Sequence, residues 1–223
     1  MFKTETHIHT SEVSICSQKR AREMVRAYKE SGYSTVFITD HFQGNTIDSY
    51  GDIPWQDKMA IFLGGYYRAK VEGDKIGLNV LPGAEFCFPG VPNHYLAYGI
   101  TKEFLDANPD IHKTDIETFS KIAHGAGLFI VQAHPYRDGK CFPTPDFIDA
   151  VEVYNSNPRH ADNSELSEKT ALEFNLPISA GSDAHREEDV ALSGIETEVE
   201  IKTAEDFIRL VRRGEIKIIR EQV

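Results

Sequence analysis

The sequence has few cysteines, a deficit of positive charge and no long apolar run. Its 223 residues include three cysteines, an odd number that argues against a disulfide framework and favours a reducing cytosol. No stretch approaches the roughly 18 apolar residues of a membrane-spanning helix. The net charge of −11 would repel a long phosphate backbone over most of the surface, but it is compatible with a small anionic substrate. We therefore expect neither a membrane nor an extended nucleic acid among its partners.

Repeats, low-complexity runs and linkers are also lacking. Residues 1–5 lead straight into a motif, so we expect no signal peptide and a cytoplasmic location. With 40% hydrophobic residues, the chain can bury one full core. We predict that residues 1–223 form a single domain.

What the sequence does contain is a regular alternation of strand and helix patterns. Short apolar runs predict strands at residues 2–9, 35–39, 77–85, 94–99, 128–133, 150–154, 177–180 and 215–220. Helical spacing predicts helices at residues 19–31, 55–72, 114–126, 164–174 and 203–214. Thr114 and Glu117 form a capping box for the third helix. The alternation favours an α/β fold with a parallel sheet or barrel.

Six of the nine histidines stand in short blocks beside the predicted strands. The blocks are Thr6-His7-Ile8-His9-Thr10, Thr39-Asp40-His41, Asn93-His94-Tyr95-Leu96, Ala133-His134-Pro135 and Gly181-Ser182-Asp183-Ala184-His185. In a parallel barrel, functional groups gather at the carboxyl ends of the strands. Only His94 begins its strand, which we place on the returning arm of a hairpin. Converging imidazoles and carboxylates are typical ligands of divalent metals.

Spacing within two blocks indicates where their side chains point. Residues i and i+2 of a strand share one face. His7 and His9 therefore aim at one place, and so do Asp183 and His185.

Three other blocks each contribute one candidate ligand. Asp40 and His41 are adjacent and cannot both point inward, so we predict His41 as the ligand and Asp40 as its support. Glu85 ends an apolar strand, where its carboxylate can bridge two cations. His134 precedes Pro135, which is expected to hold it extended and pointing in a fixed direction.

In this order the motifs resemble the PHP family (polymerase and histidinol phosphatase domains). The resemblance runs from Thr6 to about Gly214 and rests on the successive motifs HIH, TDH, PGAE, AHPYR and GSDAH. It implies a distorted TIM-like barrel of about seven β/α units. It also implies a metal-dependent phosphoesterase with two or three divalent ions, which are zinc, manganese or iron.

The resemblance further implies which residues hold the metals, with Glu85 bridging two of them. The first metal would be held by His7, His9, Glu85 and Asp183. The second would be held by Glu85, His94 and His134. The third would be held by His41 and His185.

One stretch departs from the family pattern. Where the family usually has an aspartate or histidine after the first motif, this chain has Ser14 and Ile15, and neither is a good ligand. Glu12 and Cys16 are close enough in sequence to substitute. We hypothesise that the third site is compromised.

Further candidates follow the histidine blocks. Arg137 and Arg159 are positioned to grip phosphate oxygens, and His160 to protonate a leaving group. Asn155 ends a strand at the catalytic rim and is a candidate to orient the substrate or a ligand carboxylate. For Cys87, two residues after Glu85, packing is the favoured explanation.

The leading hypothesis is hydrolysis of small phosphomonoesters by a metal-activated water. A 3′-end nuclease acting on DNA or RNA is one alternative, and a catalytically silent, metal-stabilised interaction domain is another. The amidohydrolase family also opens with histidine-x-histidine, but it needs a bridging lysine, and no lysine here ends a core strand.

Overall fold

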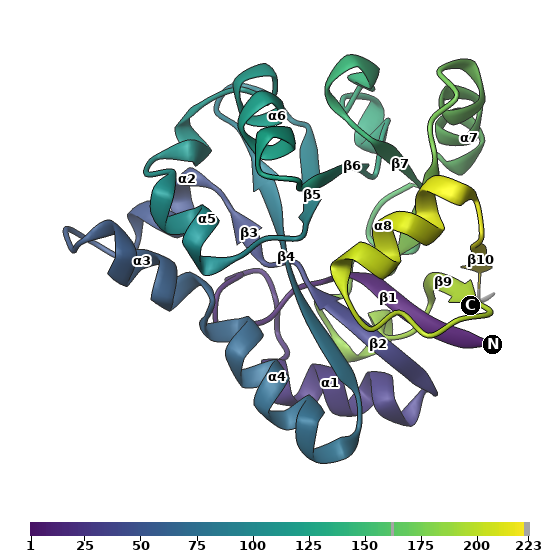
Figure 1. Cartoon of the computed structure of the whole chain (residues 1–223), viewed down its shortest axis with the longest axis horizontal. Helices are drawn as coiled ribbons and strands as arrows, with labels where there is room; N and C mark the ends of the chain where they lie inside the picture. Colours follow the sequence, from purple (N-terminus) through teal and green to yellow (C-terminus); the bar gives the residue numbers. More distant parts are fainter. Residues whose placement is uncertain (162, 221–223) are drawn as a thin grey trace.

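The computed structural model describes residues 1–161 and 163–220. Its strands are β1 (Phe2–Ile8), β2 (Tyr33–Ile38), β3 (His41–Phe42), β4 (Asn79–Cys87), β5 (His94–Tyr98), β6 (Phe129–Ala133), β7 (Ala150–Asn155), β8 (Ile178–Gly181), β9 (Ser193–Thr197) and β10 (Lys217–Arg220). They form one sheet in the order β10-β9-β1-β2-β4-β5-β6-β7-β8, with β3 beside β4 (Figure 1).

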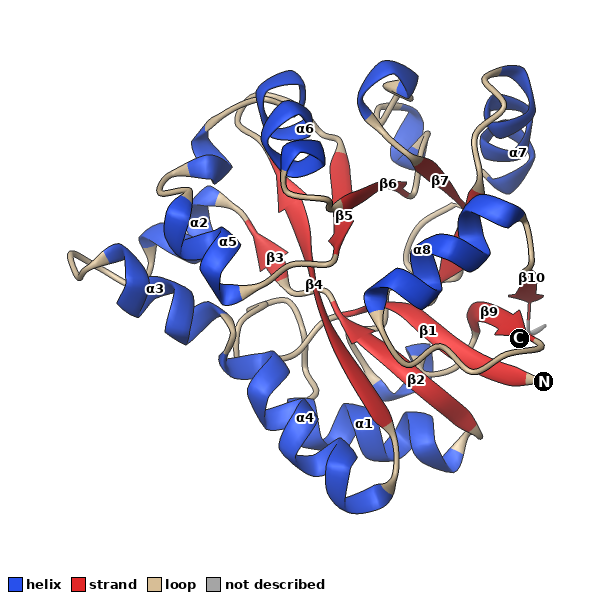
Figure 2. Cartoon of the chain, viewed as in Figure 1, coloured by secondary structure: helices blue, strands red, loops and turns tan. Residues whose placement is uncertain are grey.

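Helices surround this sheet (Figure 2). They are α1 (Ala21–Glu30), α2 (Gly44–Asp48), α3 (Trp55–Phe62), α4 (Gly64–Ile76), α5 (Lys102–Ala107), α6 (Ile116–Gly125), α7 (Ser164–Glu173) and α8 (Ala204–Arg213). None of the helices in the described residues combines the length and hydrophobicity that a membrane span requires.

The sheet is mainly parallel, with two antiparallel interruptions. Strands β1, β2 and β4 run parallel, as do β6, β7 and β8. Strand β5 lies antiparallel to both β4 and β6, so the predicted hairpin is confirmed and His94 pairs with Cys87. At the other edge, β9 is antiparallel to β1 and β10.

Hydrogen bonds beyond β8 close the sheet into a barrel. The backbone N–H of His9 donates to the carbonyl of Ala184 at 3.0 Å, and the N–H of Ala184 donates to the carbonyl of His7 at 3.3 Å. The Thr6 hydroxyl also donates to the carbonyl of Ala180 at 2.7 Å. The predicted distorted α/β barrel is confirmed, and its closure places the first and last histidine blocks side by side.

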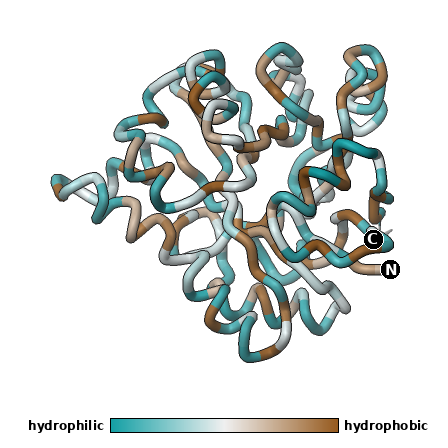
Figure 3. Tube along the Cα trace, viewed as in Figure 1, coloured by the Kyte–Doolittle hydropathy of each residue, from teal (hydrophilic) through white to brown (hydrophobic). Residues whose placement is uncertain are grey.

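Helix α8 covers the barrel end away from the histidines. Its Phe207 packs against Phe37, Tyr98 and Phe129 at centroid distances of 5.1, 4.5 and 6.2 Å. Phe129 begins β6 and Tyr98 ends the antiparallel β5, so both lie at the opposite rim from the carboxyl ends of β4 and β6. Figure 3 shows hydrophobic and hydrophilic residues alternating along α8, as an amphipathic helix requires.

Several local predictions need correction. The helix at residues 55–72 is two helices, α3 and α4, and the short β3 and β9 were not predicted. The N-cap of α6 is Asp115, whose carboxylate accepts the N–H of Thr118, because Thr114 bonds backward to the carbonyl of Ile111 instead. The helix predicted at residues 203–214 is α8, which is capped by Thr203 and Gly214.

Candidate metal centre

A buried cluster of imidazoles and carboxylates occupies one rim of the barrel. All eight predicted metal ligands contribute to it: His7, His9, His41, Glu85, His94, His134, Asp183 and His185. Parallel strands end at a common rim, so residues far apart in sequence converge there.

Glu85 lies at the centre of this cluster, and its two oxygens face different histidines. Oε1 lies 2.9 Å from Nδ1 of His94 and 3.0 Å from Nε2 of His134. Oε2 lies 2.6 Å from Nδ1 of His41 and 3.4 Å from Nε2 of His9. A carboxylate placed in this way can bridge two cations.

Asp183 faces the two histidines of the first motif, His7 and His9. Its Oδ1 lies 3.1 Å from Nε2 of His9 and 3.4 Å from Nε2 of His7. His7, His9 and Glu85 also bring one ligand atom each within 4.8 Å of one another. This arrangement suits the first of the predicted ion sites.

Several buried atoms of the cluster lack a hydrogen bond within the described chain. They are Nε2 of His7 and His9, Nδ1 of His41 and His134, and Oε2 of Glu85. Carboxylate oxygens lie at ion-pair distance from some of them, but without hydrogen-bond geometry. An unsatisfied buried polar atom costs about 1–3 kcal/mol. Divalent cations would satisfy these atoms, so the residues present fit a metal cluster.

The electrostatics favour the metal-binding protonation state at Glu85, His9 and His134. At His7, His41 and His94 burial lowers the pKa, but the facing carboxylates outweigh it and raise the pKa above its usual value. Burial raises the pKa of Glu85, but the charges of the histidines around it, with His94 foremost, hold that pKa well below its usual value. Burial and neighbouring imidazoles hold the pKa of His9 well below normal. Burial and the charge of Arg137 lower the pKa of His134 to about 4. An ionised carboxylate and neutral imidazoles are the forms that bind metal.

Glu152, which the sequence analysis missed, supports the cluster from beneath. This buried carboxylate of β7 lies 2.9 Å from Nδ1 of His7 and accepts the backbone N–H of His134 at 2.8 Å and an N–H of Asn155 at 2.9 Å. A carboxylate on the outer nitrogen of a ligand histidine fixes its tautomer and orientation. The only signal in the sequence is a charged residue inside an otherwise apolar strand.

We expect Glu152→Gln to weaken metal binding by about 10- to 100-fold, the usual cost of losing such a support. The change keeps the side-chain volume but removes the charge and turns an N–H toward a donor. Chelator competition would measure the affinity. Glu117→Gln, at an exposed carboxylate paired with Lys121, is the matched control and should bind metal normally. Unchanged affinity in Glu152→Gln would contradict the supporting role.

Asp40, which follows β2, and Ser14, in the loop after β1, support the cluster together. The Asp40 carboxylate accepts the N–H of Thr10 at 2.6 Å, its hydroxyl at 2.7 Å and the Ser14 hydroxyl at 2.8 Å. The Ser14 oxygen also accepts the N–H of His41 at 3.0 Å and lies 3.3 Å from Nδ1 of His9. The structure thus places Asp40 behind the cluster and His41 within it, as the sequence predicted.

The extended conformation predicted for His134 is wrong. Its φ of +31° lies in the left-handed region, despite the following Pro135. The bonds to Glu152 and Glu85 hold it there at both ends. Asp183 has a φ of +51° and follows the end of β8, so its pairing with His185 comes from a tight loop and not from a strand.

Arg137 is bound to the cluster itself. Its Nη2 donates to Oδ2 of Asp183 at 2.6 Å and to Oδ1 of Asn155 at 3.0 Å. Asn155 therefore orients Arg137. Asn157, which was not predicted, donates to the Asp183 carboxylate at 3.3 Å.

Arg159 and His160 occupy more peripheral positions. Arg159 forms a two-pronged ion pair with Asp189 at 2.8 and 2.6 Å. The Asp189 carboxylate also accepts the backbone N–H of His185 at 2.8 Å. His160 is exposed, with Nδ1 3.5 Å from Asp138. The charge of Arg159 is thus largely neutralised by a partner 30 residues away.

Two cysteines lie against the cluster. Burial raises the pKa of the Cys16 thiol, but hydrogen bonds with His185 and His41 outweigh it and lower that pKa to about 6. Cys87, for which packing was favoured, brings its sulfur within 4.8 Å of ligand atoms of His41 and His94. Its place beside the cluster follows from its register opposite His94 in the hairpin.

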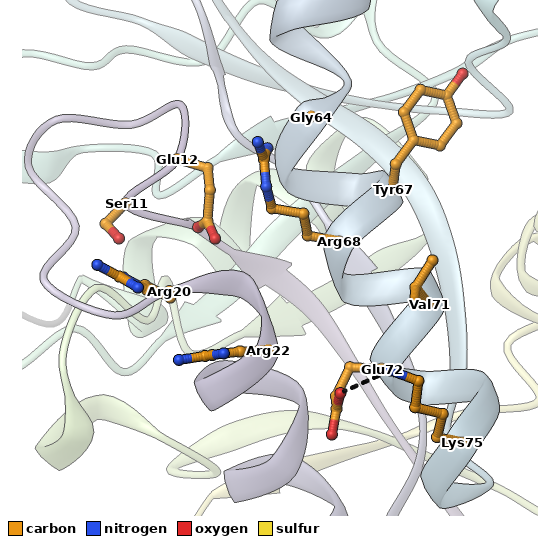
Figure 4. A pocket seen from close by; sticks show the side chains of 10 residues that line it. All are labelled: Ser11, Glu12, Arg20, Arg22, Gly64, Tyr67, Arg68, Val71, Glu72 and Lys75. Carbon is orange, nitrogen blue, oxygen red and sulfur yellow. Dashed lines mark ion pairs between the residues drawn. The ribbon is translucent and has the colours of Figure 1, made fainter.

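One cleft opens onto the cluster, and a larger one does not. The first, of about 630 Å³, is lined by cluster residues together with Cys16, Arg137, Lys140, Arg159 and Arg186. The second, of about 980 Å³, lies between α1 and α4 and contains no histidine or cysteine (Figure 4). The smaller of these two clefts is therefore the one that gives access to the cluster.

Comparison with known proteins shows what the barrel is similar to. Residues 162–216 match the family model described as PHP-associated, PHP_C. Over nearly the whole chain the fold resembles that of a solved structure that contains a predicted PHP-like metal-dependent phosphoesterase. The predicted resemblance to the PHP family is confirmed, and the chain has a PHP-type fold.

Three solved structures illustrate the likeness. A two-domain protein from Bacteroides vulgatus containing a predicted PHP-like metal-dependent phosphoesterase matches with a TM-score of 0.72 at 14% identity, over 99% of this chain and 65% of that chain. PsfC from Pseudomonas syringae matches with a TM-score of 0.71 at 18% identity, over 99% of this chain and 91% of that chain. The lesion-specific endonuclease PfuEndoQ from Pyrococcus furiosus matches with a TM-score of 0.62 at 16% identity, over 97% of this chain and 57% of that chain. No curated protein matches the sequence significantly.

Proposed function

We propose that this chain is a metal-dependent hydrolase of phosphoesters, acting mainly on small phosphomonoesters. The observation that carries the proposal is Glu85, whose two oxygens face separate histidines in a buried, ligand-rich cluster. When bound, divalent metals supply a water of lowered pKa and positive charge for the phosphoryl oxygens. The phosphoesterase named among the similar structures supports the same class of reaction.

The cleft at the cluster suits a small phosphorylated substrate. Its volume of about 630 Å³ lies within the range of small-molecule sites, about 300–1,000 Å³. Cationic side chains line it in a protein of net charge −11, which suits an anionic substrate group.

The chain's own residues would share the work of binding and proton transfer. We assign Arg137 to a phosphoryl oxygen and Asn155 to positioning Arg137. His160, exposed at the edge of the cleft, is the candidate proton donor to the leaving oxygen. Arg159 is assigned a weaker contribution, because Asp189 already pairs with it.

A nuclease is the second candidate, since the chain shares its fold with the endonuclease PfuEndoQ. The same cluster would then cut a phosphodiester, and a DNA or RNA end would have to enter the cleft.

A substrate panel tests the proposal directly. We expect the metal-loaded protein to hydrolyse phosphomonoesters, and a chelated sample to lose the activity and regain it with added metal. Released phosphate and oligonucleotide length would be measured in parallel. Cleavage of oligonucleotides alone would favour the nuclease. Inactivity on both with metals fully bound would favour the silent interaction domain.

A further inference from the structure

The cleft between α1 and α4 is separate from the histidine cluster and has a lining of its own (Figure 4). Its volume of about 980 Å³ lies at the upper end of the range of small-molecule sites, about 300–1,000 Å³. One wall is a face of α4 that carries Arg68, Val71 and Lys75 at helical spacing. The opposite wall includes Arg20 and Arg22 at the start of α1. Cationic side chains thus reach this cleft from both helices.

The three arginines of this cleft differ from the other arginines of the chain. Of the eleven arginines in the sequence, eight form an ion pair with a carboxylate among the residues that the structure describes. Those for which the described chain supplies no such partner are Arg20, Arg22 and Arg68, and all three line this one cleft. The protein has 35 acidic and 24 basic residues, so unpaired guanidiniums gathered in one place indicate an anion from outside the chain.

The two carboxylates of the cleft are engaged elsewhere. Glu12 accepts the N–H of Ala21 at 2.8 Å at the start of α1. It therefore lies away from the histidine cluster, and the hypothesis that it helps to hold a third metal has no structural support. Glu72 is bound by Arg26, which does not line the cleft, with Nε and Nη2 of the arginine at 2.7 and 2.6 Å from Oε1. Neither carboxylate neutralises the three arginines as a close partner.

We propose that the cleft between α1 and α4 is a second binding site, which takes a small molecule with a diphosphate group. This inference goes beyond the proposed hydrolysis and needs no metal. A planar guanidinium can donate two parallel hydrogen bonds to phosphate oxygens. Three guanidiniums on two helices suit an anion with more than one phosphoryl group. Tyr67 and Val71, 44% and 58% exposed on the α4 wall, offer apolar surface to an organic group attached to that anion.

Calorimetric titration with two probes tests the site. The probes are methylenediphosphonate, a diphosphate analogue that resists hydrolysis, and α,β-methylene-ADP, which adds a nucleoside. We expect saturable binding that weakens as the salt concentration rises, because the arginines are exposed. Tighter binding of the nucleotide analogue would support an organic group on the apolar surface, and equal binding would support recognition of the diphosphate alone.

A pair of double variants locates the binding site. We expect Arg22→Gln combined with Arg68→Gln to weaken binding at least about tenfold, since two charge-assisted contacts are lost. Arg209→Gln combined with Arg213→Gln is the matched control. It also removes two exposed arginines from one helix, α8, where each has a carboxylate partner outside the cleft. The control should bind both probes normally, and a thermal melt shows that each variant is folded.

Binding at the metal cluster is distinguished with Arg137→Ala, which should leave the second site unchanged. The proposal is overturned if neither probe binds the wild type, if the variant at Arg22 and Arg68 binds as tightly as the control, or if Arg137→Ala abolishes all binding. A single-stranded oligonucleotide that binds through Arg22 and Arg68 more tightly than either probe would overturn it in favour of a nucleic-acid surface. Phosphomonoester turnover is measured separately, so failure of the proposed hydrolysis would not be mistaken for failure of this site.

Discussion

Glu85→Gln is expected to remove metal from two sites at once. We also expect it to reduce the rate of hydrolysis by more than about 100-fold, which exceeds the usual effect of losing a residue that only supports a metal ligand. The carboxylate is fully buried and faces His94 and His134 with one oxygen and His41 and His9 with the other. An amide keeps the shape but removes the charge. It also turns an N–H toward one of these two groups. Both groups would therefore lose an anionic ligand together.

Elemental analysis of the purified variant measures this effect directly. A fall of two metal equivalents per chain, with hydrolysis reduced in parallel, is the expected result. Glu152→Gln is the informative comparison, since its carboxylate contacts His7 from outside the cluster and should lower affinity without abolishing a site. A thermal melt of each metal-free variant separates ligand loss from misfolding. Full metal content in Glu85→Gln would refute the bridging assignment.

The sequence predicted the membership of this cluster better than its geometry. Strand periodicity correctly placed His7 and His9 on one side, where Nε2 of each faces Oδ1 of Asp183, although β1 ends at Ile8 and its register with β2 shifts between Glu5 and Ile8. The same rule also paired Asp183 with His185, but these two residues lie in a loop and not in a strand. Asp183 has a left-handed backbone after β8, so its orientation depends on the loop and its contacts.

Residues that act through long-range contacts were the hardest to predict. Glu152 is one charged residue in an apolar strand, and its role depends on β7 lying beside β6. Arg159 was predicted to bind phosphate oxygens, but its guanidinium forms an ion pair with Asp189. No local pattern encodes either contact. Barrel closure is equally non-local, because it joins the ends of β1 and β8 across most of the chain.

Arg137→Ala is expected to lower kcat/KM for the best phosphomonoester by roughly 10- to 150-fold. Loss of a charge-assisted hydrogen bond accounts for about 1.5–3 kcal/mol of that change. The guanidinium is anchored by Asp183 and Asn155 through Nη2, and its Nε has no hydrogen-bond partner in the described part of the chain. An anchored guanidinium that lines the cleft is preorganised to bind a phosphoryl oxygen.

The same anchoring gives Arg137 a second possible role, as a support for Asp183, and the two roles differ in what they change. If Arg137 contacts the substrate, the variant keeps its metals and loses kcat/KM, and Arg137→Lys recovers little because the fork is lost. If it only supports Asp183, metal affinity falls and excess metal restores the rate. Arg159→Ala is the comparison and should have a smaller effect, because Asp189 already occupies that guanidinium. Equal specificity constants in Arg137→Ala and wild type, both fully loaded with metal, would exclude Arg137 from the reaction.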